Sequence, residues 1–338
     1  MQFLNEKFCI TGGTGSFGKK MVSRLLDLGV KEIRVFSRDE KKQDDMRKEF
    51  SDKRLKFLIG DVRNYEDLNM AFKGVDFVFH AAALKQVPSC EFFPDQAILT
   101  NIEGTINAVK SAKINGIQKF VLLSTDKAVY PINAMGMTKA LAEKVLQAEV
   151  RRDSSNTEFM VTRYGNVMGS RGSVIPLFIQ QIINEEEITI TNPHMTRFLM
   201  SLEESIELVL FAFLKGESGS IYVHKAPSCR VGDLAGALSE MHSKKSKIRL
   251  VGTRHGEKLY ETLVSEEEMA FARDHGLYYS IPLDERDLNY DSFVEKGARE
   301  SENQIFNSFN SHNTEILAGN KLREFLNKQD FILESVSV

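Results

Sequence analysis

Short apolar runs recur along the first half of the chain, each about as long as a strand and rich in β-branched or aromatic residues. Stretches with helical periodicity separate most of them, as at Lys19–Leu28, Tyr65–Phe72 and Ile102–Asn115. This alternation predicts an α/β fold with a Rossmann-like, doubly wound parallel sheet covered on both faces. Ligands of such sheets bind at the carboxyl ends of the strands. The runs are Phe8–Ile10, Ile33–Phe36, Leu55–Ile59, Phe77–Phe79, Phe120–Leu123 and Phe159–Val161.

The alternation stops at about residue 168, and the second half of the chain is less regular. We therefore predict a dinucleotide-binding domain over residues 1–168, rejoined by about 199–222, and a smaller α/β substrate-binding lobe over 169–198 and 223–338. The polar segment 284–312 is expected to lie extended on the surface, with packing against another subunit as a second option. Isolated strands are predicted at Ile188–Thr191, Ile221–Val223 and Ile248–Val251.

Composition and charge exclude several classes of protein. The chain has 338 residues, with 44 basic and 47 acidic side chains and a net charge of −3, so nucleic acid is not the expected partner. Its three cysteines are far apart and its seven histidines are scattered, so neither a disulfide framework nor a metal site is expected. The apolar run Leu208–Leu214 is too short to cross a bilayer, and the N-terminus does not read as a signal peptide. We expect a cytoplasmic protein without a membrane partner.

A glycine-rich segment directly follows the first predicted strand and leads into a helix. Glycines there permit a tight turn and a close approach of the backbone to a pyrophosphate, and the helix N-terminus offers free N–H groups to the phosphates. A structural turn is the alternative, but the strand before it and the helix after it favour a dinucleotide site. The expected contacts are Gly12, Thr14, Gly15, Ser16, Phe17 and Gly18.

The end of the second predicted strand bears on the choice between NAD and NADP. A carboxylate there favours NAD through the ribose 2′-hydroxyl, whereas an arginine favours the 2′-phosphate of NADP. Arg38 stands at this position, with Ser37 as a hydroxyl donor and Lys42 as a further cation. We therefore favour NADP as the cofactor, while Asp39 and Glu40 keep NAD open.

Two further strand ends extend the expected cofactor site. Asp61 and Val62 follow the third strand, where Asp61 could accept a hydrogen bond from the adenine amine. Ala81 and Ala82 follow the fourth strand, and their small side chains would let the cofactor lie against the backbone.

The sequence Ser124-Thr125-Asp126-Lys127 follows the fifth strand, at the edge where the nicotinamide is expected. An Asp–Lys pair supplies a proton donor or acceptor and an amine whose pKa can be tuned. Burial and the second cation Lys139 would both lower the pKa of Lys127, as a catalytic base requires. An ordinary surface salt bridge is the alternative interpretation.

The glycine loop, the strand-end Ser/Thr and Lys139 resemble the extended short-chain dehydrogenase/reductase family. Five motifs follow, at Ser124–Ala128, Arg163–Val167, Ser170–Val174, Met195–Phe198 and His255–Lys258. Together they resemble the UDP-N-acetylglucosamine 4,6-dehydratases of that family. Met135 and the segment Leu84–Pro94 are similar to the configuration-inverting branch (5-epimerases) of capsule and O-antigen biosynthesis. The resemblance implies NADP as cofactor, UDP-N-acetylglucosamine as substrate, Lys139 at the nicotinamide ribose and a homo-oligomer, with a hexamer as one option.

One position departs from the family pattern. Met135 stands where the family's Tyr-x-x-x-Lys motif has its catalytic tyrosine, and a thioether cannot perform acid–base chemistry. The chain is therefore either a non-catalytic NADP-binding scaffold or an enzyme whose proton transfers have moved to neighbouring groups. The retained Asp126 and Lys127 favour an enzyme. Tyr130 is a candidate replacement, although a role in shaping the turn beside Pro131 is the favoured interpretation.

The resemblance also implies roles for the residues around the reacting sugar. Lys127 would remove the C5 proton, Asp126 would protonate the departing C6 oxygen, and Ser124 or Thr125 would orient the C4 hydroxyl. A C5-retaining or pseudaminic-acid-type dehydratase of the same substrate is the second enzyme candidate.

Substrate contacts are expected from cations of the second half of the chain. Arg171, Arg197 and Arg254 stand in family-like motifs, and arginine suits a diphosphate through bidentate contacts, although each could form a structural ion pair. Lys85 is expected to reach the hexose, and Asn166 the sugar or its phosphate. Glu257 is expected at the substrate, or paired with Lys258 in support of Arg254.

Overall fold

A computed structural model of the chain describes residues 3–152, 156–169, 173–244, 246–253, 256–284, 306–329 and 332. Its central element, within these residues, is a 9-stranded sheet with the order β13-β14-β9-β6-β5-β4-β1-β2-β3. Neighbours from β3 to β9 are parallel, and β14 and β13 continue the sheet antiparallel. The order β3-β2-β1-β4-β5-β6 is that of a Rossmann fold, so the predicted fold class is confirmed. The strands are β1 (Lys7–Thr11), β2 (Glu32–Ser37), β3 (Leu55–Ile59), β4 (Phe77–His80), β5 (Lys119–Leu123), β6 (Glu158–Arg163), β9 (Ile221–His224), β13 (Arg273–Asp274) and β14 (Tyr278–Ile281).

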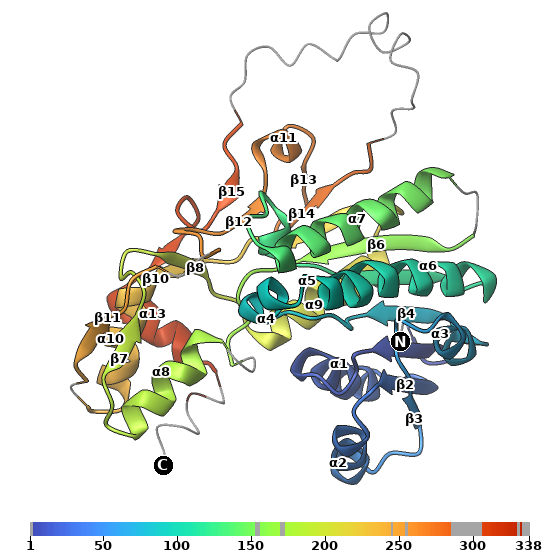
Figure 1. Cartoon of the computed structure of the whole chain (residues 1–338), viewed down its shortest axis with the longest axis horizontal. Helices are drawn as coiled ribbons and strands as arrows, with labels where there is room; N and C mark the ends of the chain where they lie inside the picture. Colours follow the sequence, from blue (N-terminus) through green and yellow to red (C-terminus); the bar gives the residue numbers. More distant parts are fainter. Residues whose placement is uncertain are drawn as a thin grey trace, which may run out of the picture.

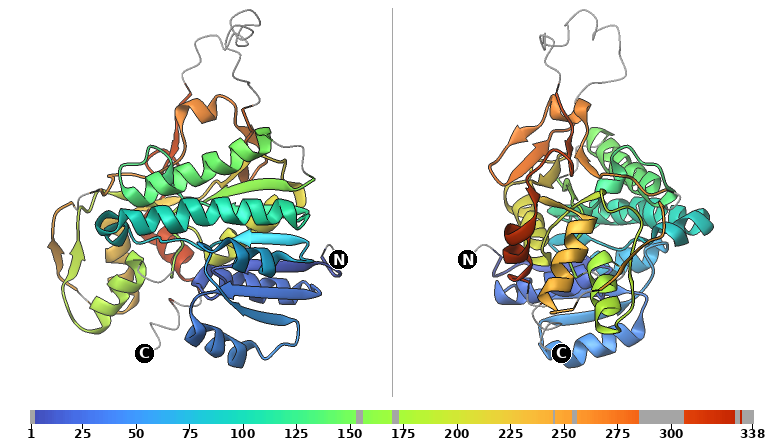
Figure 2. Two further views of the ribbon diagram at one scale, coloured as in Figure 1. Left: turned by 45° about the vertical axis from the view of Figure 1, so that its right-hand side comes forward. Right: turned by 90° about the vertical axis from the view of Figure 1, so that its left-hand side faces the viewer.

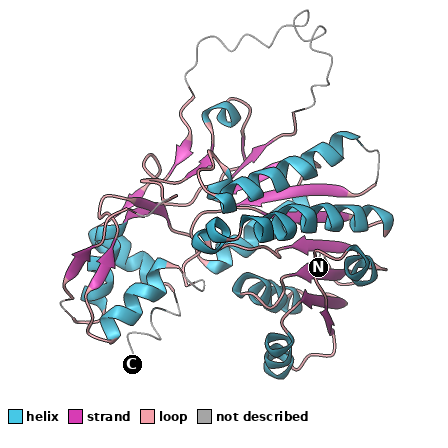
Figure 3. Ribbon diagram, in the orientation of Figure 1, coloured by secondary structure: helices cyan, strands magenta, loops and turns pink. Residues whose placement is uncertain are grey.

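Helices cover both faces of this sheet (Figures 1 and 3). On one face α1 packs beside α9, and on the other α6 lies between α3 and α7. Each apolar run predicted in the first half forms a sheet strand, since the alternation of strand and helix is a local property of the sequence. The helices are α1 (Ser16–Asp27), α2 (Glu40–Phe50), α3 (Tyr65–Phe72), α6 (Gly104–Ile114), α7 (Ala134–Arg152) and α9 (Leu202–Lys215), with a π-helix, η1 (Ile98–Glu103), leading into α6.

A smaller lobe with its own hydrophobic core lies at one end of the strands (Figure 2). Its strand β7 (Ile188–Ile190) pairs with β11 (Ile248–Leu250), so two predicted strands meet there. A second small sheet has the order β16-β10-β8. The other elements of the lobe are β8 (Thr196–Phe198), β10 (Ser228–Arg230), β16 (Ile316–Leu317), α8 (Val174–Ile183), α10 (Val231–Met241) and α13 (Gly319–Leu326).

The predicted lobe boundary needs a correction after residue 223. Strands β13 and β14 fall within the range assigned to the lobe, yet they pair onto β9 and extend the large sheet. Strand β12 (Thr262–Val264), which pairs with β15 (Phe309–Asn310), buries Leu263 and Val264 in the core of that sheet. These strands are too short for the sequence pattern to show which sheet they join. The chain therefore crosses repeatedly between the lobe and the large sheet. The larger cavity described below lies between these two parts.

Candidate active site

Two cavities open at the carboxyl ends of the parallel strands and share two lining residues, Lys127 and Asn166. The first, about 670 Å³, is lined by the glycine loop and by the ends of β2, β4 and β5. The second, about 880 Å³, lies between the large sheet and the lobe. The predicted cofactor residues that line the first cavity are Gly12, Thr14, Gly15, Ser16, Phe17, Gly18, Ser37, Arg38, Lys42, Val62, Ala81, Ala82 and Lys139.

The glycine loop has the shape that a dinucleotide phosphate requires. Gly12 has a φ of +68°, and a Cβ there would come within 2.9 Å of the backbone of Ala82. The loop turns directly into α1, with Gly15 as its N-cap, so α1 begins at Ser16, ahead of the predicted Lys19. Its first N–H groups therefore face the cavity end of the sheet, where they can bind phosphate oxygens.

The residues directly after β2 include one that faces the cavity, Arg38, and one that caps the next helix, Asp39. Arg38 lines the cavity with its side chain 53% exposed, and its guanidinium lies 3.6 Å from Asp61. Asp39 instead caps α2 by accepting a hydrogen bond from the backbone N–H of Lys42. Asp61 pairs with Arg63 at 2.6 Å and does not line the cavity, although Val62 beside it does. Asp39 nevertheless lines the same cavity, as do the cations Arg38 and Lys42, so both signs of charge face the expected ribose position.

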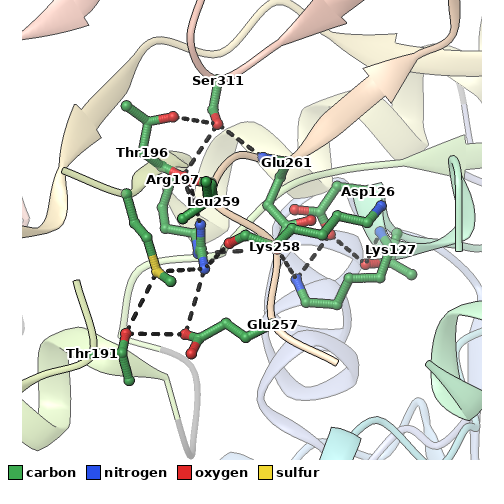
Figure 4. A network of polar contacts seen from close by, with 12 residues as sticks. Asp126, Lys127, Thr191, Thr196, Arg197, Glu257, Lys258, Leu259, Glu261 and Ser311 are labelled. Atoms are coloured by element: carbon green, nitrogen blue, oxygen red, sulfur yellow. Dashed lines mark hydrogen bonds and ion pairs between the residues drawn. The ribbon is translucent and has the colours of Figure 1, made fainter. Parts of the chain in front are cut away.

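At the end of β5 the chain forms a single 3-10 turn, η2 (Asp126–Ala128), which carries Asp126 and Lys127 (Figure 4). Lys127 lines both cavities, whereas Asp126 is fully buried behind it and lines neither. Asp126 Oδ1 accepts hydrogen bonds from Thr125 Oγ1 at 2.8 Å and from Lys127 Nζ at 3.0 Å. Glu261 Oε1 lies 3.6 Å from Lys127 Nζ on the other side. Gly136 lets α7 approach this turn, because a Cβ there would be 2.2 Å from the carbonyl oxygen of Lys127.

The predicted direction of the Lys127 pKa shift is wrong. Burial acts to lower the pKa of Lys127, but the carboxylates of Asp126 and Glu261 outweigh it, and the pKa lies above its usual value. The neighbouring cation is Arg197 and not Lys139. It is Lys139 whose pKa burial lowers, to about 8, with Glu143 opposing that shift. Lys127 therefore rests as an ammonium held by two carboxylates.

The hydroxyl groups predicted to orient the substrate are already engaged. Ser124 donates to Glu143, and Glu143 binds Arg163 at 2.6 Å, all three side chains being buried. Thr125 donates to Asp126. Both Ser124 and Thr125 line the first cavity, called the cofactor cavity from here on, and Thr125 is half-buried there. Ser124 is thus tied to the buried ion pair beneath the site.

Neither Met135 nor Tyr130 supplies the missing phenol. Met135 is buried against Cys90 and Ala97 and borders the cofactor cavity. Tyr130 is 48% exposed and lines neither cavity; its hydroxyl donates to Glu267 at 2.9 Å and accepts from the backbone N–H of Glu266. The candidate role of Tyr130 as replacement base is therefore wrong. Proton transfer must rely on other groups.

The substrate cations predicted from the second half are only partly described. Arg197 lines the larger cavity and donates to the carbonyl oxygens of Thr196 at 2.8 Å and Lys258 at 2.9 Å. Its ion-pair partners are Glu257 at 3.5 Å and Glu261 at 3.9 Å, whereas Lys258 donates to the carbonyl oxygen of Val129. Arg171 and Arg254 lie outside the described residues.

Two other predicted contacts fall on the junction and on the cofactor side. Asn166 lines both cavities, and its buried Oδ1 has no hydrogen-bond partner among the described residues. Lys85 lines the cofactor cavity and not the larger one, so its predicted contact with the hexose is not supported by its position.

Sequence reasoning missed Glu261. This residue is 3% exposed, lines the larger cavity and lies just before β12. A signal was present: a carboxylate directly precedes the apolar run Thr262-Leu263-Val264, where a buried strand begins. The buried ion pair between Arg163 and Glu143 was not predicted either. Each of these residues lies inside an apolar or helical pattern that does not show which charged partner it meets.

The fold and the glycine loop are those of a dinucleotide-binding protein, and similarity to known proteins assigns the chain to the nucleotide-sugar epimerase and dehydratase group of the extended short-chain dehydrogenases/reductases. The chain belongs to the polysaccharide biosynthesis protein family, whose sequence profile matches residues 8–283. A profile of the C-terminal part of such proteins matches residues 284–332.

Relatives and solved structures agree with this assignment. A protein of Rickettsia bellii (strain RML369-C) named UDP-glucose 4-epimerase is 54% identical over 339 residues, 99% of each chain. The X-ray structure of Pen from Bacillus thuringiensis has a TM-score of 0.88 and 36% identity, covering 97% of this chain and all of Pen (100%). DesIV, a dTDP-glucose 4,6-dehydratase from Streptomyces venezuelae, has a TM-score of 0.69 and 23% identity, covering 75% of this chain and 86% of its own, and shares the fold.

Two features are absent from the part of the chain that the structure describes. No helix among the described residues has the length and apolar character needed to span a membrane. In the same residues, no three or more histidine, cysteine, aspartate or glutamate side chains gather in a way that could hold a metal ion.

Proposed function

We propose that this protein dehydrates UDP-N-acetylglucosamine at C4 and C6 with inversion at C5, giving UDP-2-acetamido-2,6-dideoxy-β-L-arabino-hex-4-ulose for polysaccharide synthesis. The observation that carries the proposal is the position of Lys127. It lines both cavities and lies between two buried carboxylates, Asp126 and Glu261. A sugar in the larger cavity would therefore meet its proton-transferring groups beside the cofactor.

The cofactor that fits is NADP. The backbone of Gly12 leaves the space that a pyrophosphate needs, and Arg38 offers a cation to a 2′-phosphate. When bound, NADP supplies the hydride transfer that oxidises C4 and later reduces C6. Lys139, buried at the wall of the cavity, is available to the nicotinamide ribose.

The side chains of this chain then handle the protons. A ketone at C4 acidifies the C5 proton, and Lys127 as a free amine removes it. Asp126, having taken the proton of the C4 hydroxyl through water, gives it to the C6 oxygen, which leaves as water. Arg197 binds the substrate diphosphate beside Glu257, with Arg171 and Arg254 assigned to the same task by their motifs. Asn166 contacts the sugar or its phosphate from the junction of the two cavities.

A second candidate function is epimerisation at C4, favoured by the name UDP-glucose 4-epimerase carried by relatives such as the 54% identical Rickettsia bellii protein. Epimerisation returns the hydride to C4 and needs one base there. The family's tyrosine, which would be that base, is Met135 here. The additional buried carboxylate and amine groups suit elimination, which moves more protons than epimerisation does.

Mass spectrometry of the product separates these functions. The protein is incubated with NADP and either UDP-N-acetylglucosamine or UDP-glucose. Loss of one water from UDP-N-acetylglucosamine is expected, whereas a product of unchanged mass with an inverted C4 would establish the epimerase. NMR spectra of a product formed in deuterated water would then distinguish C5 inversion from C5 retention. No reaction with either substrate would favour a non-catalytic NADP-binding scaffold.

A substitution at Lys127 tests its role. Lys127→Ala should abolish water loss while leaving NADP bound, since Lys127 only borders the cofactor cavity. Lys110→Ala, at an exposed position of α6, is the matched control and should retain activity. Near-normal turnover by Lys127→Ala would remove Lys127 from the mechanism. The proposal includes a cytoplasmic location and a homo-oligomeric state. Light scattering of the purified protein measures its molar mass and therefore the number of subunits.

A further inference from the structure

Glu261 has cations beside it in the site, but within the part of the chain that the structure describes its carboxylate lacks the hydrogen bonds that a structural carboxylate usually has. Its side chain is buried, with 4% of it exposed, and Oε2 has no hydrogen-bond partner among the described residues. Oε1 lies 3.6 Å from Lys127 Nζ and 3.9 Å from Arg197 Nε, beyond hydrogen-bond distance of both. The residue lines the larger cavity, so its carboxylate lies at the wall of the space proposed for the sugar.

A hydrogen bond from the backbone N–H of Glu261 helps to fix the position of this residue. Its N–H donates to Ser311 Oγ at 3.0 Å, and Ser311 Oγ also contacts Thr196 Oγ1 at 2.7 Å (Figure 4). Segments far apart in the sequence therefore hold the carboxylate against Lys127. A buried carboxylate held in place without hydrogen bonds to its oxygens is costly for stability, which points to a functional reason for keeping it.

Electrostatics distinguish Glu261 from Asp126. Asp126 Oδ1 accepts hydrogen bonds from Thr125 and Lys127, although its Oδ2 also has no partner among the described residues. For Glu261, burial raises the pKa, and Asp126 adds to that shift. The cations Lys127, Arg197 and Lys258 face Glu261 and oppose it without cancelling it. Burial and the charge of Asp126 thus make Glu261 accept a proton more readily than an ordinary glutamate does.

The resting charge of Lys127 makes such an acceptor necessary. Lys127 is held as an ammonium, so it must lose a proton before it can remove the one at C5. Resting on the function proposed above, we propose that Glu261 is the proton store of this site. It takes a proton from Lys127 before C5 is deprotonated and returns that proton to C5 after C6 has been reduced.

The protons of this cycle balance. The proton moves from Lys127 Nζ to Glu261 Oε1, leaving an amine and a carboxylic acid. The amine then breaks the C5–H bond and becomes an ammonium again. Asp126 carries the C4 hydroxyl proton to the C6 oxygen, which leaves as water. The Glu261 acid finally protonates C5 and returns to a carboxylate. Because the group that removes the C5 proton and the group that replaces it are different, C5 can invert.

The test separates C4 oxidation from water loss. Formation of enzyme-bound NADPH on mixing with UDP-N-acetylglucosamine reports C4 oxidation, and mass spectrometry reports water loss. In Glu261→Gln, NADPH formation should stay within about threefold of the unsubstituted enzyme, while water loss should fall by about 100-fold or more, as for loss of one acid–base group. Glu261→Asp, which keeps a carboxylate, should recover at least about tenfold of that loss.

A matched control is Glu257→Gln, which removes a different carboxylate of the same cavity, one that contacts Arg197 at 3.5 Å. It should raise KM for the nucleotide sugar more than it lowers kcat. Thermal unfolding and NADP affinity of each variant establish that it is folded.

Each outcome decides between the two proposals. Water loss by Glu261→Gln within about threefold of the unsubstituted enzyme overturns the proton store and leaves the dehydratase standing. An equal fall of NADPH formation and water loss, without recovery in Glu261→Asp, also overturns it, because that pattern is structural. If the unsubstituted enzyme loses no water from UDP-N-acetylglucosamine, the dehydratase proposal fails, and the proton store fails with it.

Discussion

Lys127 illustrates how a single residue's chemistry depends on groups that are distant in the sequence. Its neighbours in the chain include one carboxylate, Asp126, while the second carboxylate, Glu261, comes from a segment distant in the sequence. Together they reverse the shift that burial alone would produce. A lysine in such a setting is a proton donor at rest and a base only after a proton transfer, so its role depends on its partners.

At the residue scale, Arg38 should determine the choice of dinucleotide. Arg38→Ala removes the cation that the cavity offers to a 2′-phosphate. Loss of a charge-assisted contact of about 1.5–3 kcal/mol should weaken NADP binding by about 10- to 100-fold and leave NAD binding almost unchanged. Calorimetric titration with each dinucleotide measures this. Arg63→Ala is the control, because Arg63 also pairs with Asp61 but does not line the cavity. Equal losses for both dinucleotides would argue against the assignment.

His80 should make the protein less stable in acid. It is buried at the end of β4 between Thr11 Oγ1 at 2.8 Å and Thr105 Oγ1 at 3.4 Å, and burial lowers its pKa to about 3. Between the usual pKa of about 6.5 and that value, the unfolded chain binds one more proton than the folded one. The free energy of unfolding should therefore fall as the pH falls through this window.

Urea unfolding of His80→Gln at several pH values measures this contribution. Its stability should depend on pH less steeply than that of the unsubstituted protein, by up to about 1.4 kcal/mol per pH unit below pH 6. His194→Gln, at an exposed position, should leave the slope unchanged. Identical slopes for His80→Gln and the unsubstituted protein would show that His80 is not responsible.

At the scale of elements, a buried ion-pair network joins three segments beneath the reactive turn. Arg163 at the end of β6 binds Glu143 of α7 at 2.6 Å and Glu268 of α11 (Glu266–Met269) at 2.7 Å. Glu268 also completes the capping box of α11 with Ser265. The segment that carries Glu261 is thereby attached to the helix that carries Lys139, so the network fixes the substrate side against the cofactor side.

Removing one member of this network should destabilise the whole protein. Glu143→Gln leaves the buried charge of Arg163 with Glu268 alone and should cost about 3 kcal/mol, typical of a broken buried pair. Glu149→Gln, on the same helix, removes a more exposed ion pair with Lys113 and should cost less than about 1 kcal/mol. Denaturant unfolding gives both values. Similar small costs for the two variants would mean that the Arg163 network does not hold these elements.

At the scale of the whole molecule, the chain has separate cores for its two parts. The sheet and its helices bury one cluster, while α8, α10 and α13 with their strands bury another. The last part of the chain supplies Leu317, Leu322 and Leu326 to the lobe, although Ser311 before them contacts the site. The C-terminal segment is therefore part of the lobe's core and of the substrate cavity's support.

Leu322→Ala should weaken the lobe and spare the cofactor domain. Leu322 is fully buried on α13, so the substitution should cost about 2–5 kcal/mol by leaving a cavity. We expect a lower-temperature unfolding step, weaker binding of the nucleotide sugar and unchanged NADP affinity. Leu250→Ala, at a position that is 63% exposed, is the control and should unfold as the unsubstituted protein does. A single transition with equal loss of both ligands would show that the two cores unfold together.

The pattern of apolar residues was enough to predict the Rossmann sheet, because strand and helix periodicities are local and each run of the first half is buried within its own unit. The cofactor cavity followed from the same pattern, since the carboxyl ends of parallel strands meet at one edge and the residues after β1, β2, β4 and β5 gather there. Asp126 and Lys127 were found in this way as well.

Only the tertiary structure decided what the pair at the end of β5 can do. Glu261, Arg197 and Ser311 reach it from segments that share no pattern with it, and short strands such as β13 and β14 gave no sign of the sheet they join. Periodicity records which face of an element is buried, but not which charges a long connection brings beside it. The sequence by itself determined the fold and the cofactor side. The packing of the second half determined the charge of Lys127 and the place of Glu261, because Coulomb interactions depend on distance in space and not along the chain.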